Sequence, residues 1–311
     1  MISFTPRRFR WSALLACCSM FAALPGAAEL NCPSLKLATA HHNPPARHAR
    51  GLLWRIVKPG LAPSYLFGTI HLGDDDVVTL PTPVSEAFTQ SRRLVIEAKL
   101  DDVDLLQWSQ TLLFGEGTPL RDRLGSELFQ RTVALLSRYG IPGEAAAIMK
   151  PWAVYLTLMT PPATGGIPLD LALAMRAAET GKAVAGLETL EEQANVLAEL
   201  PSDDQVALVT DVVCHYDVLQ ADIQAMKRLY LSRDLAGLVA AAMRYELSET
   251  PRYQYLLQQV LWDRNQRMVQ RMGPYLSEGQ AFVAVGALHL PGERGILGLL
   301  EKAGYSLESV Y

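Results

Sequence analysis

The chain has 311 residues, half of them apolar and 19% charged, with a formal net charge of −4 at neutral pH. This content of apolar residues is enough for an extensive core, in one large domain or two small ones. No block of basic residues remains after the N-terminal segment described below, so the composition argues against a nucleic-acid partner.

Residues 1–28 have the pattern of a secretory signal peptide. Arginines precede the apolar run Trp11–Leu24, and small residues ending at Ala28 provide a cleavage site. The run is too short for a stable transmembrane span, so we expect an exported protein, periplasmic or secreted. The pair Cys17-Cys18 suggests a lipoprotein as an alternative, but too few apolar residues precede it. Cleavage after Ala28 leaves 25 Lys and Arg against 32 Asp and Glu, a net charge of −7.

Two further regions follow the signal peptide. Residues 29–50 lack an apolar period and predict an extended leader, in which His41, His42 and His48 are expected to be solvated. Residues 51–311 are predicted to form a single domain. Two cysteines remain after cleavage, and their even number in an exported chain predicts the disulfide Cys32–Cys214.

The domain is predicted to open with a β-hairpin. Residues 52–57 and 65–70 are strand-like runs, and a Lys-Pro-Gly turn at residues 58–60 separates them. A helix is then expected from Thr82 as N-cap and Pro83 to about Ser91. Residues 93–97 form the next predicted strand.

The middle of the chain, residues 101–250, is predicted to be mostly helical. Pro151 forces a kink or a new helix start within the apolar stretch 145–159. An alanine-rich helix over residues 167–181 is followed by a short strand over residues 183–187. The string Ser-Asp-Asp-Gln at residues 202–205 predicts a capping box before a long helical stretch.

The C-terminal part returns to alternating elements. Thr250-Pro251 opens a helix to about Met272, and strand 282–285, helix 295–303 and strand 305–310 follow. Both ends of the domain therefore contain a β–loop–α–β unit. The predicted fold class is α/β (mixed α+β), with a central mixed sheet built from these two units and a large helical insertion between them.

Two similar strings end strands near opposite ends of the domain. Gly-x-x-His occurs at residues 68–71 and again at residues 286–289, each time after an apolar run and before a turn. This repetition predicts His71 and His289 at equivalent ends of neighbouring strands. Ligand and catalytic sites of α/β proteins lie at such strand ends.

Several charged residues interrupt apolar patterns. Arg264, with Asn265 beside it, falls on the apolar face of the helix that starts at Pro251, whereas Arg267 and Arg271 can project to water. A guanidinium that faces a core needs an anion or a structural ion pair. Three carboxylates are candidates for this site because two directly end short strands and one opens a helix: Glu97, Glu188 and Asp170.

Imidazole and carboxylate groups together are what a divalent metal site requires. The chain has no His-Glu-x-x-His helix, so such a site would be assembled from distant segments. It also has no Gly-x-Ser-x-Gly elbow and no Gly-x-Gly-x-x-Gly or phosphate loop, which argues against a serine esterase and against nucleotide chemistry.

The combined motifs resemble the TraB/GumN family, which includes the Tiki proteins of animals and PrgY-type proteins of bacteria. The resemblance covers residues 50–311, and the second string differs by Ala287 where many members have glycine. The matching stretches are residues 65–71, Glu97, residues 170–182, 186–193, 264–268 and 286–292.

The resemblance implies a metal-dependent hydrolase, peptidase-like, acting on an exported peptide or protein. It implies that His71 and His289 hold a divalent metal, such as manganese, cobalt or zinc, together with Glu97 or, in its place, Glu188. Glu97, Glu188, Arg264 and Asn265 are then the candidate catalytic residues: a glutamate as general base and Arg264 on developing negative charge. Gly68 and Gly286 would let the backbone approach the metal or substrate.

Two alternatives fit the same residues. One is a metal-free hydrolase or esterase in which a histidine is the base and the glutamates orient it. The other is a non-catalytic protein that binds a peptide or glycan in the same pocket.

Overall fold

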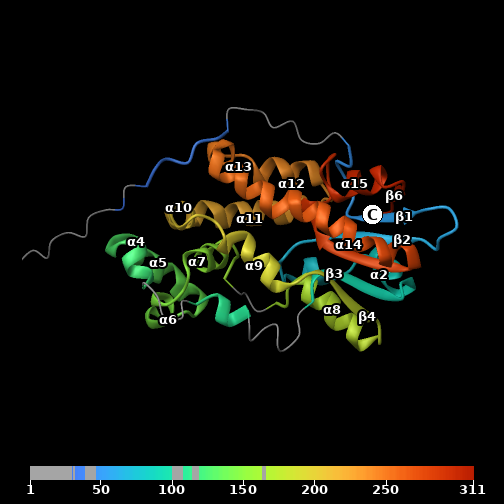
Figure 1. Ribbon diagram of the computed structural model, residues 1–311, viewed down its shortest axis with the longest axis horizontal. Helices are drawn as coiled ribbons and strands as arrows, with labels where there is room; N and C mark the ends of the chain where they lie inside the picture. The colour runs from blue at the N-terminus through green and yellow to red at the C-terminus, as the bar shows by residue number, and fades with distance from the viewer. Residues whose placement is uncertain (1–29, 31, 39–46, 100–107, 114–118, 163–165) are drawn as a thin grey trace, which may run out of the picture.

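The computed structural model describes residues 30, 32–38, 47–99, 108–113, 119–162 and 166–311 (Figure 1). The predicted signal peptide, residues 1–28, lies outside this part, as do His41 and His42. Within it, no helix combines the length and the apolar character needed to cross a membrane.

The strands form one six-stranded mixed sheet in the order β4-β3-β5-β2-β1-β6. β2 and β3 both pair in parallel with β5, β4 pairs in parallel with β3, and β1 pairs antiparallel with β2 and β6. The α/β fold class with a central mixed sheet is therefore confirmed. The strands are β1 Leu53–Val57, β2 Ser64–Thr69, β3 Arg93–Ala98, β4 Ala183–Glu188, β5 Ala281–Gly286 and β6 Ser306–Ser309.

Both predicted β–loop–α–β units contribute to the sheet. The first runs from β2 through α1 and α2 to β3, and the second from β5 through α15 to β6. The large helical insertion lies between β3 and β5 and contributes β4. The helices of the two units are α1 Asp75–Val78, α2 Thr82–Gln90 and α15 Ile296–Lys302.

The insertion supplies the other helices of the described chain. Helix α7 begins at Pro151, as the sequence predicts. The proline lies in the first turn, where a backbone N–H has no partner within the helix. The helices before β4 are α4 Leu120–Leu124, α5 Ser126–Leu136, α6 Gly143–Ala147, α7 Pro151–Leu158 and α8 Leu169–Glu179. Those after it are α9 Leu190–Ala198, α10 Ser202–Cys214, α11 Tyr216–Leu231, α12 Leu235–Ala242, α13 Pro251–Leu257 and α14 Arg264–Glu278.

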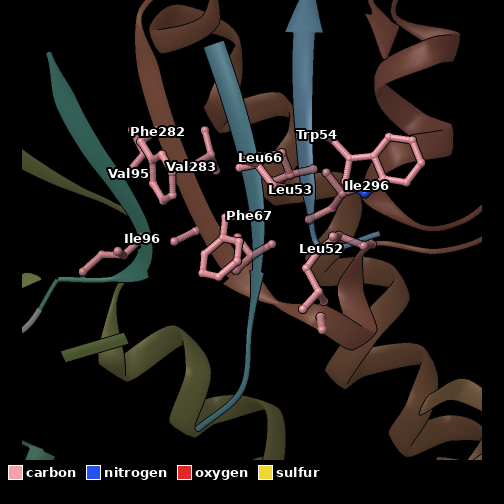
Figure 2. Packing of buried hydrophobic residues seen from close by; sticks show 14 of the residues in the cluster. Leu52, Leu53, Trp54, Leu66, Phe67, Val95, Ile96, Phe282, Val283 and Ile296 are labelled. Atoms are coloured by element: carbon pink, nitrogen blue, oxygen red, sulfur yellow. The ribbon is translucent and has the colours of Figure 1, made fainter. Parts of the chain in front are cut away.

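Two apolar cores hold the chain together. The first lies on the sheet, where Phe67 of β2 packs against Phe282 of β5, with ring centroids 5.9 Å apart, and Val95 of the adjacent β3 is also buried (Figure 2). The second lies among helices of the insertion around Trp152 and Leu208, at the end of the molecule away from the sheet in Figure 1. The sheet edge that carries the histidines therefore belongs to a well-packed layer.

The predicted disulfide is present. Cys32 and Cys214 are bonded, with their Cα atoms 5.4 Å apart, and the bond ties the leader to the end of α10. Further along the leader, Leu37 and Arg50 form isolated bridges with Tyr245 and Asp234. The described leader is thus attached to the domain at several points.

One histidine of the leader corrects the prediction. The side chain of His48 is only 7% exposed, its Nε2 lies 3.3 Å from Glu301, and its ring packs edge-on against Trp54. His48 is therefore packed against the domain, and the expectation of a solvated side chain is wrong for it. An aromatic partner and a carboxylate from distant segments cannot be foreseen from a leader sequence without an apolar period.

Two predicted helix caps are also wrong. Thr82 and Ser202 are the predicted N-cap residues, but each is the first residue of its helix, α2 or α10. The N-cap positions are held by Pro81 and Pro201. Neither helix has a side-chain cap bond. The capping box forms at α9 instead, between Thr189 and Glu192.

The helix after Thr250 differs from the prediction in its interior and in its end. Thr250 caps α13 as predicted, accepting a bond from the Tyr253 N–H. Residues 258–263 form a π-helical segment, and α14 continues past the predicted end at Met272 to Glu278 with Pro274 inside it. A π segment widens a helix locally and often occurs next to a functional residue; here Arg264 follows it directly.

Candidate functional site

The two Gly-x-x-His strings lie on neighbouring strands. β2 and β5 are parallel, and Thr69 pairs with Gly286 at their last residues. Each histidine therefore follows the carboxyl end of its strand at the same edge of the sheet, as the repetition predicts. The register is offset by one residue, since Gly68 pairs with Val285.

His289 is buried and its tautomer is determined by its neighbours. Nδ2 of Asn265 donates to the carbonyl of Arg294 at 2.9 Å, which identifies Oδ1 as the atom 2.6 Å from Nδ1 of His289. An amide oxygen can only accept, so Nδ1 carries the proton. Burial lowers the pKa of His289 to about 4, so the ring is neutral at pH 7 and Nε2 has a free lone pair.

Glu97 faces that lone pair. Its Oε1 lies 3.7 Å from Nε2 of His289, beyond hydrogen-bond distance, and accepts the Gly286 N–H at 2.6 Å. Burial alone would raise the pKa of Glu97. The charge that His289 carries at low pH, the charges of Arg264 and His71, and the bond from Gly286 together lower this pKa to about 2. The carboxylate is therefore ionised although it is buried.

Arg264 meets the carboxylates that its position on an apolar face requires. Nη2 donates to Glu97 at 2.5 Å, Nε donates to Glu188 at 2.9 Å, and Nη1 donates to the Val260 carbonyl of the π segment. Burial lowers the pKa of this guanidinium, but Glu97 and Glu188 outweigh that effect and raise it. Arg264 is thus the centre of a buried ion-pair network.

Glu188 belongs to the same network. Its side chain is fully buried, and Arg264 and Arg267 bind its two oxygens. Arg267 and Arg271 are 34% and 41% exposed, so both reach water as expected, and they also contact Glu188 and Glu192. A carboxylate held by two guanidinium groups supports the positions of its neighbours, and its side chain has no exposed surface for substrate.

His71 has a different environment from His289. Its side chain is 66% exposed, and its Nδ1 lies 2.7 Å from Oδ2 of Asp170. The other oxygen of Asp170 accepts the Thr69 hydroxyl at 2.5 Å. The contact with Asp170 raises the pKa of His71 to about 9, and Nε2 has no hydrogen-bond partner among the described residues.

A cavity of about 500 Å³ opens beside these groups. Its lining includes the polar side chains of His71, Glu97, Asp170 and Gln193, with Asp74 and Thr160, and apolar side chains make up most of the rest. Glu188, Arg264 and His289 are absent from its lining. The predicted site residues are therefore brought together, but only part of the set faces the open space.

The two motif glycines have different roles, one of them other than expected. A Cβ on Gly286 would lie 3.3 Å from Oε1 of Glu97, so this glycine lets the backbone approach a candidate metal ligand rather than the metal or substrate itself. A Cβ on Gly68 would instead lie 3.2 Å from Ala287 and 3.1 Å from Leu290. Gly68 thus serves packing between the two motifs.

Two contributions went unassigned in the sequence. Asp170 is a candidate carboxylate in the sequence but has no partner assigned there, and the structure shows that it holds His71 from the first turn of α8. Gln193, on α9, donates to Glu97 at 3.3 Å. A helix-opening acid has an ordinary local explanation, and only the position of α8 against β2 identifies its partner.

The donors at this edge fit a divalent cation in kind. A neutral imidazole nitrogen and an ionised carboxylate oxygen face each other at 3.7 Å with no proton between them. Two ligands of one tetrahedral zinc ion lie about 3.4 Å apart, so this separation is close to that of a shared ion. Within the described residues, however, no three His, Cys, Asp or Glu side chains already converge on a common point.

Comparisons with known proteins identify relatives over most of the chain. Metalloprotease TIKI2 of Danio rerio is 25% identical over 82% of this chain, and the match covers 60% of that protein. Metalloprotease TIKI1 of Homo sapiens is 25% identical over 87% of the chain and 64% of its own length. YbaP of Escherichia coli (strain K12) is 25% identical over 76% of the chain and 88% of its own length.

The chain thus spans only about three fifths of the length of the first of these relatives. No solved structure matches the chain. The model of the TraB/PrgY/gumN family matches residues 52–309, which include both histidine motifs, Glu97, Glu188 and Arg264. The chain therefore belongs to the TraB/PrgY/gumN family.

Proposed function

We propose that this protein is a metal-dependent hydrolase that cleaves peptide bonds in an exported peptide or protein. His289, Glu97 and His71 would hold the divalent metal. Relatives about 25% identical are named metalloproteases, which supports the reaction class. The observation that carries the proposal is the lone pair of His289 facing the ionised Glu97 at 3.7 Å, because a cation between these atoms would bind both.

Both histidines have the support that metal-ligating histidines usually have. Such a histidine is oriented by an acceptor on its second ring nitrogen, most often a carboxylate or an amide oxygen. Nδ1 of His289 is held by Asn265, and Nδ1 of His71 lies beside Asp170. Nε2 of His289 already has a free lone pair. Nε2 of His71 would become a ligand when the metal displaces the proton that the contact with Asp170 favours.

The other residues have supporting roles in this proposal. Arg264 and Glu188 fix the position of Glu97 and balance its charge in the buried layer. Because each nitrogen of Arg264 already contacts a protein acceptor, we propose it as a positioning residue and not as a group that contacts substrate. Asn265 has the corresponding role for His289.

A divalent ion at this position would polarise a substrate carbonyl and lower the pKa of a bound water. The chain itself contributes an enclosed edge of the sheet, from which Glu97 and His71 face the cavity. Positioning of the substrate carbonyl would then come from the walls of this cavity. The proposed location is outside the cytoplasm, which the disulfide supports because such bonds persist in oxidising compartments.

The test is metal content and peptide hydrolysis, measured on the same preparations. Protein lacking residues 1–28 is loaded with Mn²⁺, Co²⁺ or Zn²⁺, dialysed and analysed by mass spectrometry for bound metal. We expect roughly one bound ion per chain. The metal-loaded protein should cleave members of a peptide library, and a chelator should abolish this cleavage. His289→Ala and His71→Ala should each lower both the metal content and the cleavage.

His48→Ala is the matched control, since His48 is a packed histidine on a carboxylate but lies outside the site. It should retain metal and activity. Wild-type protein that binds none of the three ions would overturn the metal proposal. Hydrolysis that persists in the chelator would favour a metal-free hydrolase, and metal binding without hydrolysis of any peptide would favour a binding protein.

A further inference from the structure

The lining of the cavity beside the candidate site has a polar part, here called the polar end, and an apolar part, here called the apolar wall. His71 and Glu97 belong to the polar end, so whatever fills the cavity lies next to the proposed reacting groups. The apolar wall comes from β3, the segment before α8, α8 itself and the start of α9. Its members include Ile96, Pro161, Leu171, Ala174 and Leu190.

Most polar side chains of the lining are engaged with other protein groups, whereas Nε2 of His71 has no hydrogen-bond partner among the described residues. Asp170 is held by Thr69 and His71, and the Gln193 amide donates to Glu97. Asp74 pairs with Lys227 at 2.9 Å. A glycan needs many free donors and acceptors around its hydroxyl groups, and these side chains leave few. The cavity is therefore suited to an apolar group that extends from a polar backbone.

Helix α8 connects the reacting end with the apolar wall. Asp170 in its first turn holds His71, while Leu171 and Ala174 of the same helix line the cavity. Leu171 is 38% exposed, and Met175, four residues on, is 44% exposed. Apolar side chains that folding leaves uncovered on one face of this helix extend the apolar wall beyond the cavity mouth.

The wall is fixed in place by close backbone contact. Gly73, after the first histidine motif, abuts Gly166 so closely that a Cβ on Gly73 would lie 2.5 Å from the Gly166 carbonyl carbon. The Leu169 N–H, at the start of α8, donates to the Leu72 carbonyl at 3.0 Å. The position of α8 is thus set against the loop that carries His71, and the cavity exists before any substrate binds.

We propose that this cavity is a specificity pocket that receives a large apolar side chain of an extended peptide, at a residue flanking the bond to be cut. The proposal rests on the proposed hydrolase and adds its substrate class. A volume of about 500 Å³ is ample for a leucine, methionine or phenylalanine side chain. The peptide carbonyl would then lie at the polar end, beside Glu97 and His71.

The test is the sequence preference of cleavage. Metal-loaded wild-type protein is incubated with a mixture of unstructured peptides, and the products are sequenced by mass spectrometry. We expect leucine, isoleucine, methionine or phenylalanine at one fixed position beside the cleaved bond. Ala174→Phe fills the pocket and should lower kcat/KM for these peptides at least tenfold, with smaller losses for peptides that have glycine or alanine there.

Ala178→Phe is the matched control. It makes the same change one turn further along α8, at an exposed residue outside the cavity lining, and should leave the preference unchanged. If Ala174→Phe does not fold, Leu171→Asn replaces it, because Leu171 is partly exposed and its change removes apolar surface without adding bulk. Cleavage without an apolar preference, or a preference that these variants leave unchanged, would overturn the pocket.

A binding measurement separates this inference from the proposed function. N-acetyl-leucine amide and N-acetyl-glycine amide are titrated into wild-type and Ala174→Phe protein and followed by NMR. Suppose that no peptide is cleaved with any metal, but that wild-type protein binds the leucine amide at least tenfold more tightly than the glycine amide and Ala174→Phe protein does not. The proposed hydrolase activity is then wrong, and the proposed apolar pocket is supported. Equal binding of both amides would overturn the pocket whatever the outcome for hydrolysis.

Discussion

The two Gly-x-x-His motifs are nearly the same in sequence but differ in chemical state. His71 is exposed beside Asp170, which raises its pKa to about 9, whereas burial lowers the pKa of His289 to about 4. The first motif ends in a loop over the cavity, and the second ends in a short 3₁₀ turn inside the core. A short motif can therefore position an imidazole at a strand end, but its surroundings determine whether the ring is charged.

The largest change in stability is expected from the buried ion-pair network of Arg264, Glu97 and Glu188, which contacts the second motif at Gly286. Arg264→Leu leaves Glu97 and Glu188 buried without their shared cation, and we expect a loss of about 3–5 kcal/mol in the free energy of unfolding, measured with urea. Adding Glu97→Gln and Glu188→Gln should recover much of this loss, because the uncompensated charges are then removed.

Arg271→Leu is the control for the network. Arg271 is about 41% exposed and pairs with Glu192 at the surface, so its loss should cost less than about 1 kcal/mol. Equal losses for Arg264→Leu and Arg271→Leu would contradict the view that the first guanidinium balances buried charge.

Substitution of the two motif glycines should affect different properties: stability at Gly68, and metal content and activity at Gly286. Gly68→Ala inserts a methyl group against Ala287 and Leu290, and we expect a cost of about 1–3 kcal/mol from overpacking. Gly286→Ala places its methyl group 3.3 Å from Oε1 of Glu97, so its larger effect should be on metal content and hydrolysis. Thermal unfolding and metal analysis of both variants test this; the opposite assignment would refute the different roles.

Two substitutions compare the groups that orient the two histidines. Asn265→Ala leaves the Nδ1–H of His289 and the Arg294 carbonyl without their partners in the core, at a cost of about 1–3 kcal/mol. Asp170→Asn, beside the exposed His71, should cost less than about 1 kcal/mol at pH 7. Urea unfolding of the metal-free proteins measures both. If Asp170→Asn lowers the free energy of unfolding more than Asn265→Ala does, the proposed difference between the buried and the exposed motif is wrong.

The smallest effect is a dependence on pH. The folded pKa of His71 is raised from 6.5 to about 9, so the stability contributed by its pair with Asp170 is fully present below pH 6.5 and is lost as the pH rises through 9. Asp170→Asn should therefore destabilise the metal-free protein at pH 6, by no more than about 1 kcal/mol, and have almost no effect near pH 10. NMR titration of His71 in both proteins provides the direct check, and a difference in stability that grows with pH would contradict it.

Much of the fold could be predicted because its signals are local. The position of the two histidines at equivalent ends of neighbouring strands follows from the repeated motif at residues 68–71 and 286–289, and the start of α7 follows from Pro151. Cap positions were less reliable, since Thr82 and Ser202 match cap preferences but lie inside the first turn. The continuation of α14 through Pro274 depends on packing, which outweighs a local signal for a helix end.

The candidate site was predictable as a set of residue types but not as a network. An arginine on an apolar helix face requires an anion, and Glu97 and Glu188 end neighbouring strands β3 and β4, so their pairing with Arg264 is a reasonable expectation. The role of Asp170 toward His71 was not predicted, because its position as a helix-opening acid already has a sufficient local explanation.

The sequence by itself determined the order of the elements, the family and the residues that meet at the sheet edge, because these depend on periodicity and on motifs encoded in short segments. Only the tertiary structure decided which histidine is neutral, which carboxylate faces the cavity and which is enclosed by guanidinium groups. Protonation depends on burial and on charges a few ångströms away. Those neighbours come from segments up to about 190 residues apart, such as Glu97 and Gly286, and only folding brings them together.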